Sequence, residues 1–156
     1  MNRKQSAGIL LFRRTFHETE VFLVHPGGPF WKNKDKGAWS IPKGEFNDSE
    51  NALEAAQREF LEETGIMLSG KFTELKPVKL KSGKEVFAWA LEKDIDFENI
   101  VSNNFEMEWP PHSGKRQSFP EVDKGEWMNI EEARRKLNGM QVNFLDQLQQ
   151  LLEEKN

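Results

Sequence analysis

The stretch GEFNDSENALEAAQREFLEETGI, residues 44–66, decides the fold expected for the whole chain. Its middle part, residues 50–64, is rich in alanine, leucine and glutamate, which favour an α-helix of about four turns. Asp48 and Ser49 are good N-cap residues just before this run. Gly65 fits the left-handed backbone position that commonly follows a helix end. The sequence therefore predicts a helix over residues 50–64.

The predicted helix has two distinct faces when its residues are placed at 100° intervals. Leu53, Ala56 and Phe60 share a face suited to burial. The adjoining face carries three carboxylates with only alanines beside them, those of Glu59, Glu62 and Glu63. Carboxylate oxygens are preferred ligands of Mg²⁺, which also binds substrate phosphates. Arg58 is placed to orient these carboxylates through charge-assisted hydrogen bonds.

An acidic helix face is, by itself, more often solvated surface than a metal site. The complete spacing reverses this, because it resembles the Nudix box, Gly-x5-Glu-x7-Arg-Glu-apolar-x-Glu-Glu-x-Gly-apolar. The matching residues are Gly44, Glu50, Arg58, Glu59, Phe60, Glu62, Glu63, Gly65 and Ile66. Seven of these positions require one residue type, so a chance match is expected in fewer than about one in a million sequences. Phe60 replaces the usual Ile, Leu or Val, which changes packing rather than chemistry.

The resemblance implies both a fold and a reaction. Nudix domains belong to the α/β (α+β) class and form a three-layer α/β/α sandwich around a mixed sheet, so we expect residues 1–156 to form a single Nudix hydrolase domain. Nudix hydrolases use Mg²⁺, or Mn²⁺ in its place, to cleave a diphosphate linkage in a nucleoside diphosphate joined to another group. Carried onto this chain, the metal ligands are Glu59, Glu62, Glu63 and the backbone carbonyl of Gly44. Glycine lets that loop approach the metal closely. Glu50, opposite Glu59 on the helical wheel, is interpreted as positioning the loop or the helix start.

Many Nudix hydrolases add a distant loop glutamate that serves as metal ligand or general base. Glu106, Glu108 and Glu121 are the candidates here. In the diadenosine tetraphosphate hydrolases of the family, this glutamate lies six residues before a tryptophan, and Glu121 lies six residues before Trp127. We therefore choose Glu121 as catalytic residue and metal ligand, with a solvent-facing loop acid as the alternative. The predicted catalytic set is Arg58, Glu59, Glu62, Glu63 and Glu121.

Two further positions resemble substrate contacts of the same hydrolases. The segment Trp39-Ser40-Ile41-Pro42-Lys43-Gly44 resembles their Trp-x-x-Pro-Lys-Gly, which makes Lys43 a candidate phosphate contact. Phe144 resembles the position from which an aromatic ring stacks on adenine, although it equally fits the buried stripe of the last helix. Two loops carry cations and aromatic rings suited to phosphate and base, namely Lys32, Lys34, Lys36, Lys115 and Arg116 with Trp31 and Trp109.

The flanking sequence predicts the remaining elements. Short apolar or aromatic runs predict strands at residues 7–12, 21–24, 38–41, 66–68, 85–91 and 126–128. Residues 92–120 are expected to be mostly loop. A helix is predicted over residues 130–137, with Asn129 and Glu132 as a capping box. The last helix carries an amphipathic stripe that should dock on the sheet, formed by Phe144, Leu145, Leu148, Leu151 and Leu152.

Composition narrows the classes of function. The chain has 156 residues, 37% of them hydrophobic, and a net charge of −4. The acidic balance disfavours a long nucleic acid as partner. No apolar run approaches the roughly 20 residues of a membrane span, and the N-terminal segment is too charged for a secretion signal. With no cysteine there is no disulfide or thiolate metal site, so a cytoplasmic location is expected.

These observations predict metal-dependent hydrolysis of a diphosphate linkage by water attack on phosphorus. The expected small-molecule substrate is a dinucleoside polyphosphate or a nucleoside triphosphate. Two alternatives are an RNA 5′-end pyrophosphohydrolase and a non-catalytic Nudix-fold module that senses a nucleotide. His17, His25 and His112 are separated from one another and from the glutamates, so we expect no metal or catalytic role for them. The exact substrate, the attacked phosphorus, the number of metal ions and the oligomeric state are left open.

Overall fold

The computed structural model describes residues 5–95 and 100–154. The strands are β1 (Gln5–Arg14), β2 (Thr19–Pro26), β3 (Lys43–Phe46), β4 (Thr73–Glu74), β5 (Val78–Lys79), β6 (Glu85–Glu92), β7 (Asn104–Glu108), β8 (Arg116–Pro120) and β9 (Val122–Asn129). The helices are α1 (Ala52–Thr64), α2 (Ile130–Lys136), the short 3₁₀ turn η2 (Gly139–Gln141) and α3 (Val142–Glu154). Within the described ranges, no helix is long and apolar enough to cross a membrane.

β1 is the central strand of a mixed sheet whose order is β4-β6-β1-β2-β9. β6 is parallel to β1, whereas β2 and β3 are antiparallel to it. Along the edge opposite β6, β1 pairs with β3 over residues 5–8 and with β2 over residues 12–14. The strand predicted at residues 38–41 is reduced to isolated bridges such as that between Val24 and Ser40. Residues 38–41 therefore lie between β2, which they contact at Val24, and β3, which follows them in the chain.

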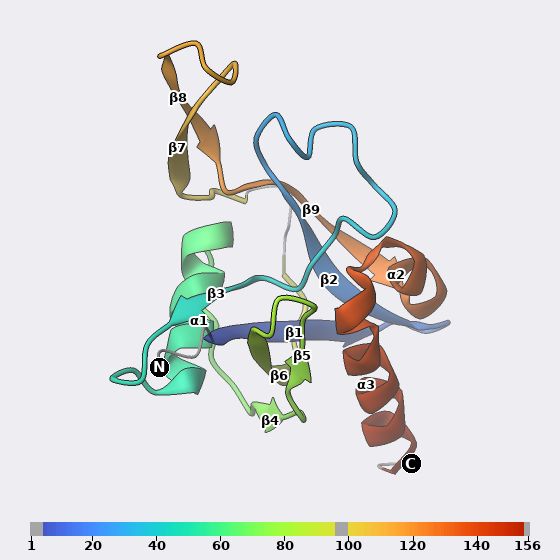
Figure 1. Cartoon of the computed structure of the whole chain (residues 1–156). Helices are drawn as coiled ribbons and strands as arrows, with labels where there is room; N and C mark the ends of the chain where they lie inside the picture. Colours follow the sequence, from blue (N-terminus) through green and yellow to red (C-terminus); the bar gives the residue numbers. More distant parts are fainter. Residues whose placement is uncertain (1–4, 96–99, 155–156) are drawn as a thin grey trace.

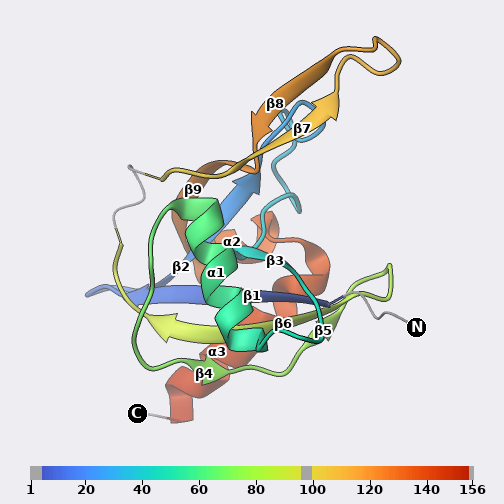
Figure 2. The ribbon, with the colours of Figure 1, turned by 90° about the vertical axis from the view of Figure 1, so that its left-hand side faces the viewer.

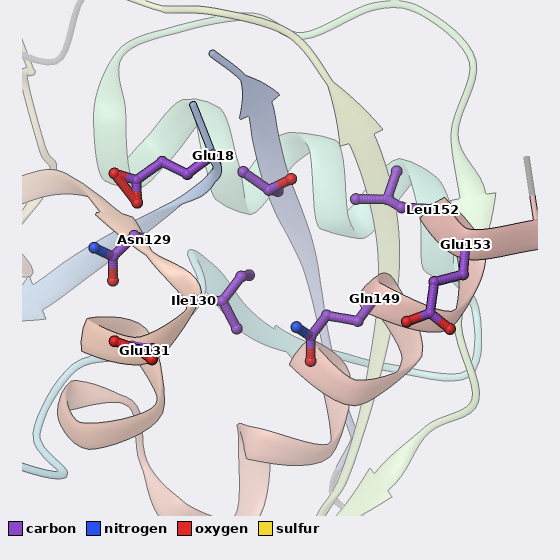
Figure 3. Close-up of a pocket in the computed structure, with 8 residues that line it drawn as sticks. Glu18, Asn129, Ile130, Glu131, Gln149, Leu152 and Glu153 are labelled. Carbon is purple, nitrogen blue, oxygen red and sulfur yellow. The ribbon is translucent and has the colours of Figure 1, made fainter. Parts of the chain in front are cut away.

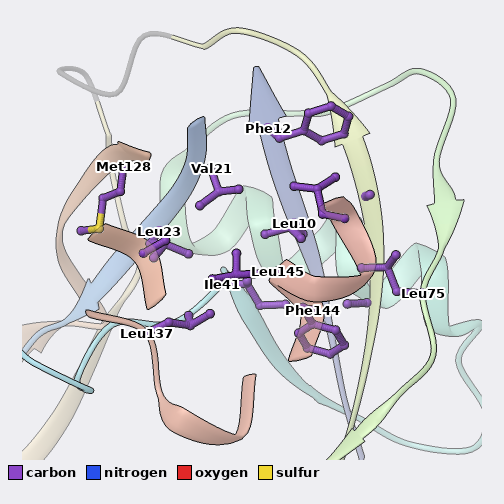
Figure 4. Close-up of a cluster of buried hydrophobic side chains, with 14 of the residues drawn as sticks. Leu10, Phe12, Val21, Leu23, Ile41, Leu75, Met128, Leu137, Phe144 and Leu145 are labelled. Atoms are coloured by element: carbon purple, nitrogen blue, oxygen red, sulfur yellow. The ribbon is translucent and has the colours of Figure 1, made fainter. Parts of the chain in front are cut away.

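Helices cover both faces of the sheet, with α1 on one side and α2 and α3 on the other (Figure 1, Figure 2). Alternate residues of a strand point to opposite faces. Ile9 and Leu11 accordingly belong to the cluster beneath α1, whereas Leu10 and Phe12 belong to the cluster beneath α3. Figure 4 shows this second cluster, in which Leu10 and Leu23 lie near Phe144 and Leu145. The expected three-layer α/β/α sandwich around a mixed sheet is confirmed.

α1 begins later than predicted because a turn comes before it. Its N-cap is Asn51, whose side chain accepts a hydrogen bond from the backbone N–H of Glu54 at 3.1 Å. Asp48 and Ser49, the predicted caps, lie in the preceding turn instead. There the side-chain oxygen of Asn47 accepts from the backbone N–H of Ser49 at 3.0 Å. Such side-chain to backbone bonds compete with helix formation and delay its first turn.

The end of α1 agrees with the sequence, but the strand predicted after it does not form. Gly65 adopts the left-handed conformation with a φ of 78°, as predicted. Residues 66–68 lie outside the sheet. Leu68 is buried in the cluster beneath α1, and its carbonyl accepts from the Gln57 side chain at 3.3 Å. The apolar character of this segment thus reflects packing on α1 rather than strand pairing.

In their described part, residues 92–120 are mostly loop, as predicted, but they also contain β7 and β8, which pair as an antiparallel hairpin. The hairpin projects beyond the sandwich in both views (Figure 1, Figure 2). In β7, half-buried Phe105 and Met107 alternate with exposed Glu106 and Glu108. This alternation of apolar and acidic residues is a strand signal with period two, and it was available in the sequence.

The C-terminal helices match their predicted patterns. The side chain of Asn129 accepts from the backbone N–H of Glu132 at 2.8 Å, as the capping box requires. The stripe of α3 packs on the sheet, with Phe144, Leu145 and Leu148 fully buried. Phe144 therefore has no exposed ring face on which a base can stack, and the predicted substrate contact is not supported. The alternative, a side chain in the buried stripe, agrees with its position.

This burial predicts the effect of truncating the ring. Phe144→Ala should lower the free energy of unfolding by about 3–5 kcal/mol, the usual cost of removing a buried aromatic side chain. Urea denaturation followed by circular dichroism measures the loss. Phe16→Ala is the matched control, because Phe16 is 97% exposed and should change stability by less than about 0.5 kcal/mol. Equal small losses in both variants would contradict the burial of Phe144.

Candidate functional site

β3 brings its backbone directly against α1. Gly44 in β3 faces Glu59 in α1 so closely that a Cβ atom on Gly44 would overlap the Glu59 carboxylate. Glycine is therefore required if Glu59 is to keep its position. Glu59 is only 9% exposed. Burial, and next the negative charge of Glu62, raise the pKa of Glu59.

Arg58 ties the carboxylates of α1 together. Its NH1 group donates to Glu59 Oε1 at 2.9 Å and to Glu62 Oε1 at 3.1 Å. Its Nε and NH2 groups donate to the two oxygens of Glu50 at 3.2 and 3.3 Å. Glu50 precedes α1, so the helical wheel does not describe it, but its contact with Arg58 agrees with a positioning role. Arg58 therefore has the contacts expected of a residue that orients Glu59, Glu62 and Glu63, which we call the acidic cluster.

Glu63 presents an oxygen that the protein leaves without a partner. The backbone N–H of Lys43 donates to its carboxylate, yet Glu63 Oε2 is buried and has no hydrogen bond. Burial, and next the charge of Glu59, raise the pKa of Glu63 to about 8. For the half-buried ammonium of Lys43, burial lowers the pKa, and the nearby charge of Lys84 acts in the same direction. A buried carboxylate oxygen without a partner is rare in folded proteins and calls for a ligand or a proton.

Glu121 approaches the same carboxylates from the start of β9. Its backbone is held on both sides, since its N–H donates to Asn103 O at 2.8 Å and its carbonyl accepts from Gly27 N at 2.9 Å. Burial, and next the charge of Glu62, raise the pKa of Glu121. Its charge also contributes to the raised pKa of Glu63. The structure therefore brings Glu121 to the acidic cluster.

The two rejected candidates for the distal glutamate point elsewhere. Glu106 and Glu108 are exposed on the projecting β7 strand. Glu106 lies 3.9 Å from the guanidinium of Arg116. Glu108 accepts from the backbone N–H of His112 at 2.7 Å, which closes the tip of the hairpin. These contacts are local to the hairpin.

A cavity of about 230 Å³ brings several of the predicted residues together. Lys43, Glu63 and Glu121 contribute the charged part of its lining. Trp31 and Trp39 contribute aromatic surface. Such a mixture of apolar walls and a few converging polar groups is typical of small-molecule sites. Phe144 is not among the lining residues.

Gln141 is a residue of this cavity that the sequence reasoning missed. Its side chain is 1% exposed, and its Oε1 accepts from the backbone N–H of Ile41 at 3.0 Å. Its Nε2 donates to Ser40 Oγ at 3.0 Å. Gln141 thus fixes the segment that leads into β3. A single glutamine among the apolar positions before α3 was the only signal in the sequence.

A second hollow, shown in Figure 3, lies between the start of β2 and helices α2 and α3. Glu18, Glu131 and Glu153 line it, and its other lining residues include no lysine or arginine. An anionic ligand would meet only negative charge there. This hollow is therefore a poor site for a phosphate compound, although its volume of about 370 Å³ is larger.

The histidines have structural or surface positions. His17 and His112 are exposed, and His25 is buried. The Nδ1 atom of His25 lies 2.9 Å from Asp123 Oδ1, and its Nε2 atom lies 2.6 Å from the carbonyl oxygen of Lys34. His25 thereby fastens the loop at residues 27–38 to the start of β9.

The chemistry of the acidic cluster fits a hard divalent cation. Glu63 offers a buried oxygen without a partner, and Gly44 leaves its backbone open beside the Glu59 carboxylate. All the side-chain donors are carboxylate oxygens, which Mg²⁺ prefers. Among residues 5–95 and 100–154, no three acidic or histidine side chains already converge at metal-ligand distance. Because these carboxylates do not yet converge, metal binding requires some of them to move, while Arg58 holds one oxygen each of Glu59 and Glu62.

The NUDIX domain pattern matches residues 2–148. The bis(5′-nucleosyl)-tetraphosphatase [asymmetrical] of Rattus norvegicus is 45% identical over 71 residues, which cover 41% of this chain and 48% of the rat protein. The match thus spans about half of the length of that relative.

Two solved structures have a similar fold. One is a binary complex of a C. elegans Ap4A hydrolase, with a TM-score of 0.65, 20% identity, and coverage of 96% of this chain and 98% of that chain. The other is the NUDIX domain of Shewanella oneidensis NrtR complexed with ADP ribose, with a TM-score of 0.66, 14% identity, and coverage of 96% and 88%. At these identities the two structures establish the fold alone. Since the NUDIX pattern extends over nearly the whole chain and the observed sandwich agrees with it, this protein belongs to the Nudix family.

Proposed function

We propose that this protein is a divalent-metal-dependent pyrophosphohydrolase that acts on a dinucleoside polyphosphate or a nucleoside triphosphate. One observation carries the proposal: a single cavity is lined by Lys43, Glu63 and Glu121, and the buried Glu59 is near enough for its charge to raise the pKa of Glu63. The Lys43 ammonium and the carboxylates of Glu63 and Glu121 thus face the same cavity, and Glu63 contributes a buried oxygen without a hydrogen bond. This is the set of groups needed to bind a metal–phosphate compound and to activate water.

Each residue has a role that follows from its surroundings. Nudix hydrolases generally use divalent metal ions, and Mg²⁺ held by Glu59, Glu62, Glu63 and the Gly44 carbonyl would supply charge neutralisation at the phosphates. Mn²⁺ has the same preference for oxygen ligands and can substitute. Arg58 orients the carboxylates of Glu59 and Glu62.

The remaining groups act on the water and the substrate. Lys43 binds a phosphate oxygen as a point charge. Glu121 accepts a proton from the water whose oxygen bonds to phosphorus, while the bridging P–O bond on the opposite side breaks. Two phosphate-bearing products result. The raised pKa of Glu121 suits this role, because a general base works best when its pKa approaches the working pH.

The name of a relative bears on the substrate class. The rat relative is named a bis(5′-nucleosyl)-tetraphosphatase, and the match spans only half of it. Its name favours a dinucleoside polyphosphate over a nucleoside triphosphate for this chain.

A substrate panel tests the proposal. Diadenosine tetraphosphate, ATP, ADP-ribose and triphosphorylated RNA are incubated with the protein and Mg²⁺, and the products are identified. Glu63→Gln serves as the blank. We expect turnover of the dinucleoside polyphosphate well above the blank. No turnover of any compound would refute the enzyme and favour a nucleotide-sensing module, whereas turnover of RNA alone would favour the RNA pyrophosphohydrolase.

The role of Glu121 leads to a specific prediction. Glu121→Gln should lower kcat by about 10²–10⁴-fold, because the amide cannot accept the proton. The far-ultraviolet circular dichroism spectrum should be unchanged. Glu106→Gln and Glu108→Gln are matched controls and should retain kcat within about twofold, since both side chains are exposed on β7. An active Glu121→Gln variant would remove this residue from the catalytic set.

The contact between β3 and α1 gives a second prediction. Gly44→Ala places a methyl group where the Glu59 carboxylate lies. We expect weaker Mg²⁺ binding by calorimetry and a fall of kcat by at least about tenfold, because displacing a metal ligand removes charge stabilisation. Gly139→Ala is the control, since its added methyl group would meet no atom within 4 Å. Equal Mg²⁺ affinity in the two variants would contradict the assignment of Gly44.

The raised pKa of Glu63 predicts how stability depends on pH. The folded protein holds this proton up to a pH of about 8, well above the ordinary pKa of 4.5 for a glutamate carboxyl group. Because the folded state binds more protons between these values, stability in EDTA should fall as the pH rises from 5 to 8. Mg²⁺ should raise the melting temperature more at pH 8 than at pH 5, since it stabilises the ionised carboxylate.

Glu63→Gln provides the control for this pH dependence. The amide does not titrate, so the variant should show a flatter profile in EDTA and a higher melting temperature at pH 8. It should also lose most of the response to Mg²⁺. Differential scanning calorimetry at three pH values measures both effects. Parallel profiles of the wild type and the variant would show that Glu63 does not control them.

A further inference from the structure

Another cavity, separate from the hollow of Glu18, Glu131 and Glu153, adjoins the cavity lined by Lys43, Glu63 and Glu121. It has a volume of about 350 Å³ and lies between the loop at residues 27–38 and strand β7. Both views place this loop and the β7–β8 hairpin at the same end of the molecule (Figure 1, Figure 2). The two cavities share Pro26, Trp31 and Glu121 in their linings. A ligand that extends past Glu121 would therefore pass from one cavity into the other.

We call this 350 Å³ cavity the aromatic groove, and its walls are built from large apolar side chains. They are Phe30, Trp31, Phe105 and Met107. Phe30 is 60% exposed, and the other three are half-buried. The rings of Phe30 and Trp31 meet edge to face, with centroids 5.2 Å apart. A cluster of exposed aromatic surface of this kind marks a binding site more often than ordinary protein surface.

The groove is held in a defined shape on its β7 side. Phe105 packs so closely on Gly28 that a Cβ atom there would lie 2.9 Å from the ring. Gly28 also has a φ of 95°, which favours glycine for a second reason. On its other side, Phe105 contacts the Phe119 ring, with centroids 6.0 Å apart. The hairpin is thereby fixed against the loop.

The loop side is also fixed, and it adds a positive charge. His25 contacts the Lys34 carbonyl at 2.6 Å, and the indole N–H of Trp39 donates to Asp35 Oδ1 at 2.8 Å. The Lys34 ammonium lies 3.8 Å from the ring centroid of Phe30 and 5.3 Å from that of Trp31. Flat aromatic surface beside a cation matches a flat base joined to phosphate.

We propose that the aromatic groove binds the base of the second nucleoside of a dinucleoside polyphosphate, the one on the far side of the cleaved linkage from the cavity of Lys43. This inference rests on the proposed hydrolase function. Glu121 lies in the lining of both cavities, so the phosphate that is attacked lies between two nucleoside sites. The groove makes the protein select compounds that carry a nucleoside at each end of the phosphate chain.

The test compares two substrates with equal phosphate chains, diadenosine tetraphosphate and adenosine tetraphosphate, which lacks one nucleoside. Phe30→Ala should lower kcat/KM for diadenosine tetraphosphate by about 5–100-fold, mainly by raising KM, because a stacked base contributes that much to binding. Its kcat/KM for adenosine tetraphosphate should change by less than about twofold. Phe105→Ala should behave in the same way, and Phe16→Ala, remote from the groove, should affect neither substrate.

The outcomes separate the groove from the proposed function. If the wild type cleaves neither compound above the Glu63→Gln blank, the hydrolase proposal fails and this inference fails with it. If the wild type is active but Phe30→Ala loses the same factor on both substrates, or on neither, only the groove is refuted. Phe30 is exposed, so Phe30→Ala should not unfold the protein. The Phe30→Ala result therefore tests the groove even if Phe105→Ala loosens the β7–β8 hairpin.

Discussion

Every part of the candidate site depends on how closely β3 can approach α1. The approach begins in β1, where a Cβ atom on Gly8 would overlap the carbonyl oxygen of Pro42. One step further along β3, Gly44 brings its backbone against the carboxylate of Glu59. The adjoining face of α1 is fixed by the burial of Phe60 against the sheet. Two glycines and one buried ring thus determine where the carboxylates lie.

This arrangement has an electrostatic cost that the fold offsets only in part. Burial and like charges raise the pKa of Glu59, Glu63 and Glu121 together. Arg58 is the one cation within hydrogen-bonding distance of Glu59 among the described residues. Clusters of raised carboxylate pKa values occur at functional sites, where a ligand supplies the missing positive charge. A divalent cation would meet that need here, and a polyphosphate would complete its coordination.

The sequence predicted the parts of the molecule that local spacing controls. Most of the Nudix box lies on α1, so its spacing alone places Glu59, Glu62 and Glu63 on one face. The β7–β8 hairpin was missed, although the alternation of apolar and acidic residues in β7 is a local signal. For Phe144 the sequence left two alternatives. Phe144 satisfied two patterns at once, and only the docking of α3 on the sheet distinguishes them. The single domain, the cytoplasmic location and the distal role of Glu121 stay predictions.

The most direct test of the central claim is an anomalous diffraction map from crystals soaked in MnCl₂. Mn²⁺ prefers the same oxygen ligands as Mg²⁺ and can be located by its anomalous scattering. The account predicts a peak between the Gly44 carbonyl and the carboxylates of Glu59, Glu62 and Glu63. A peak only in the hollow of Glu18, Glu131 and Glu153, or no peak at saturating Mn²⁺, would contradict it.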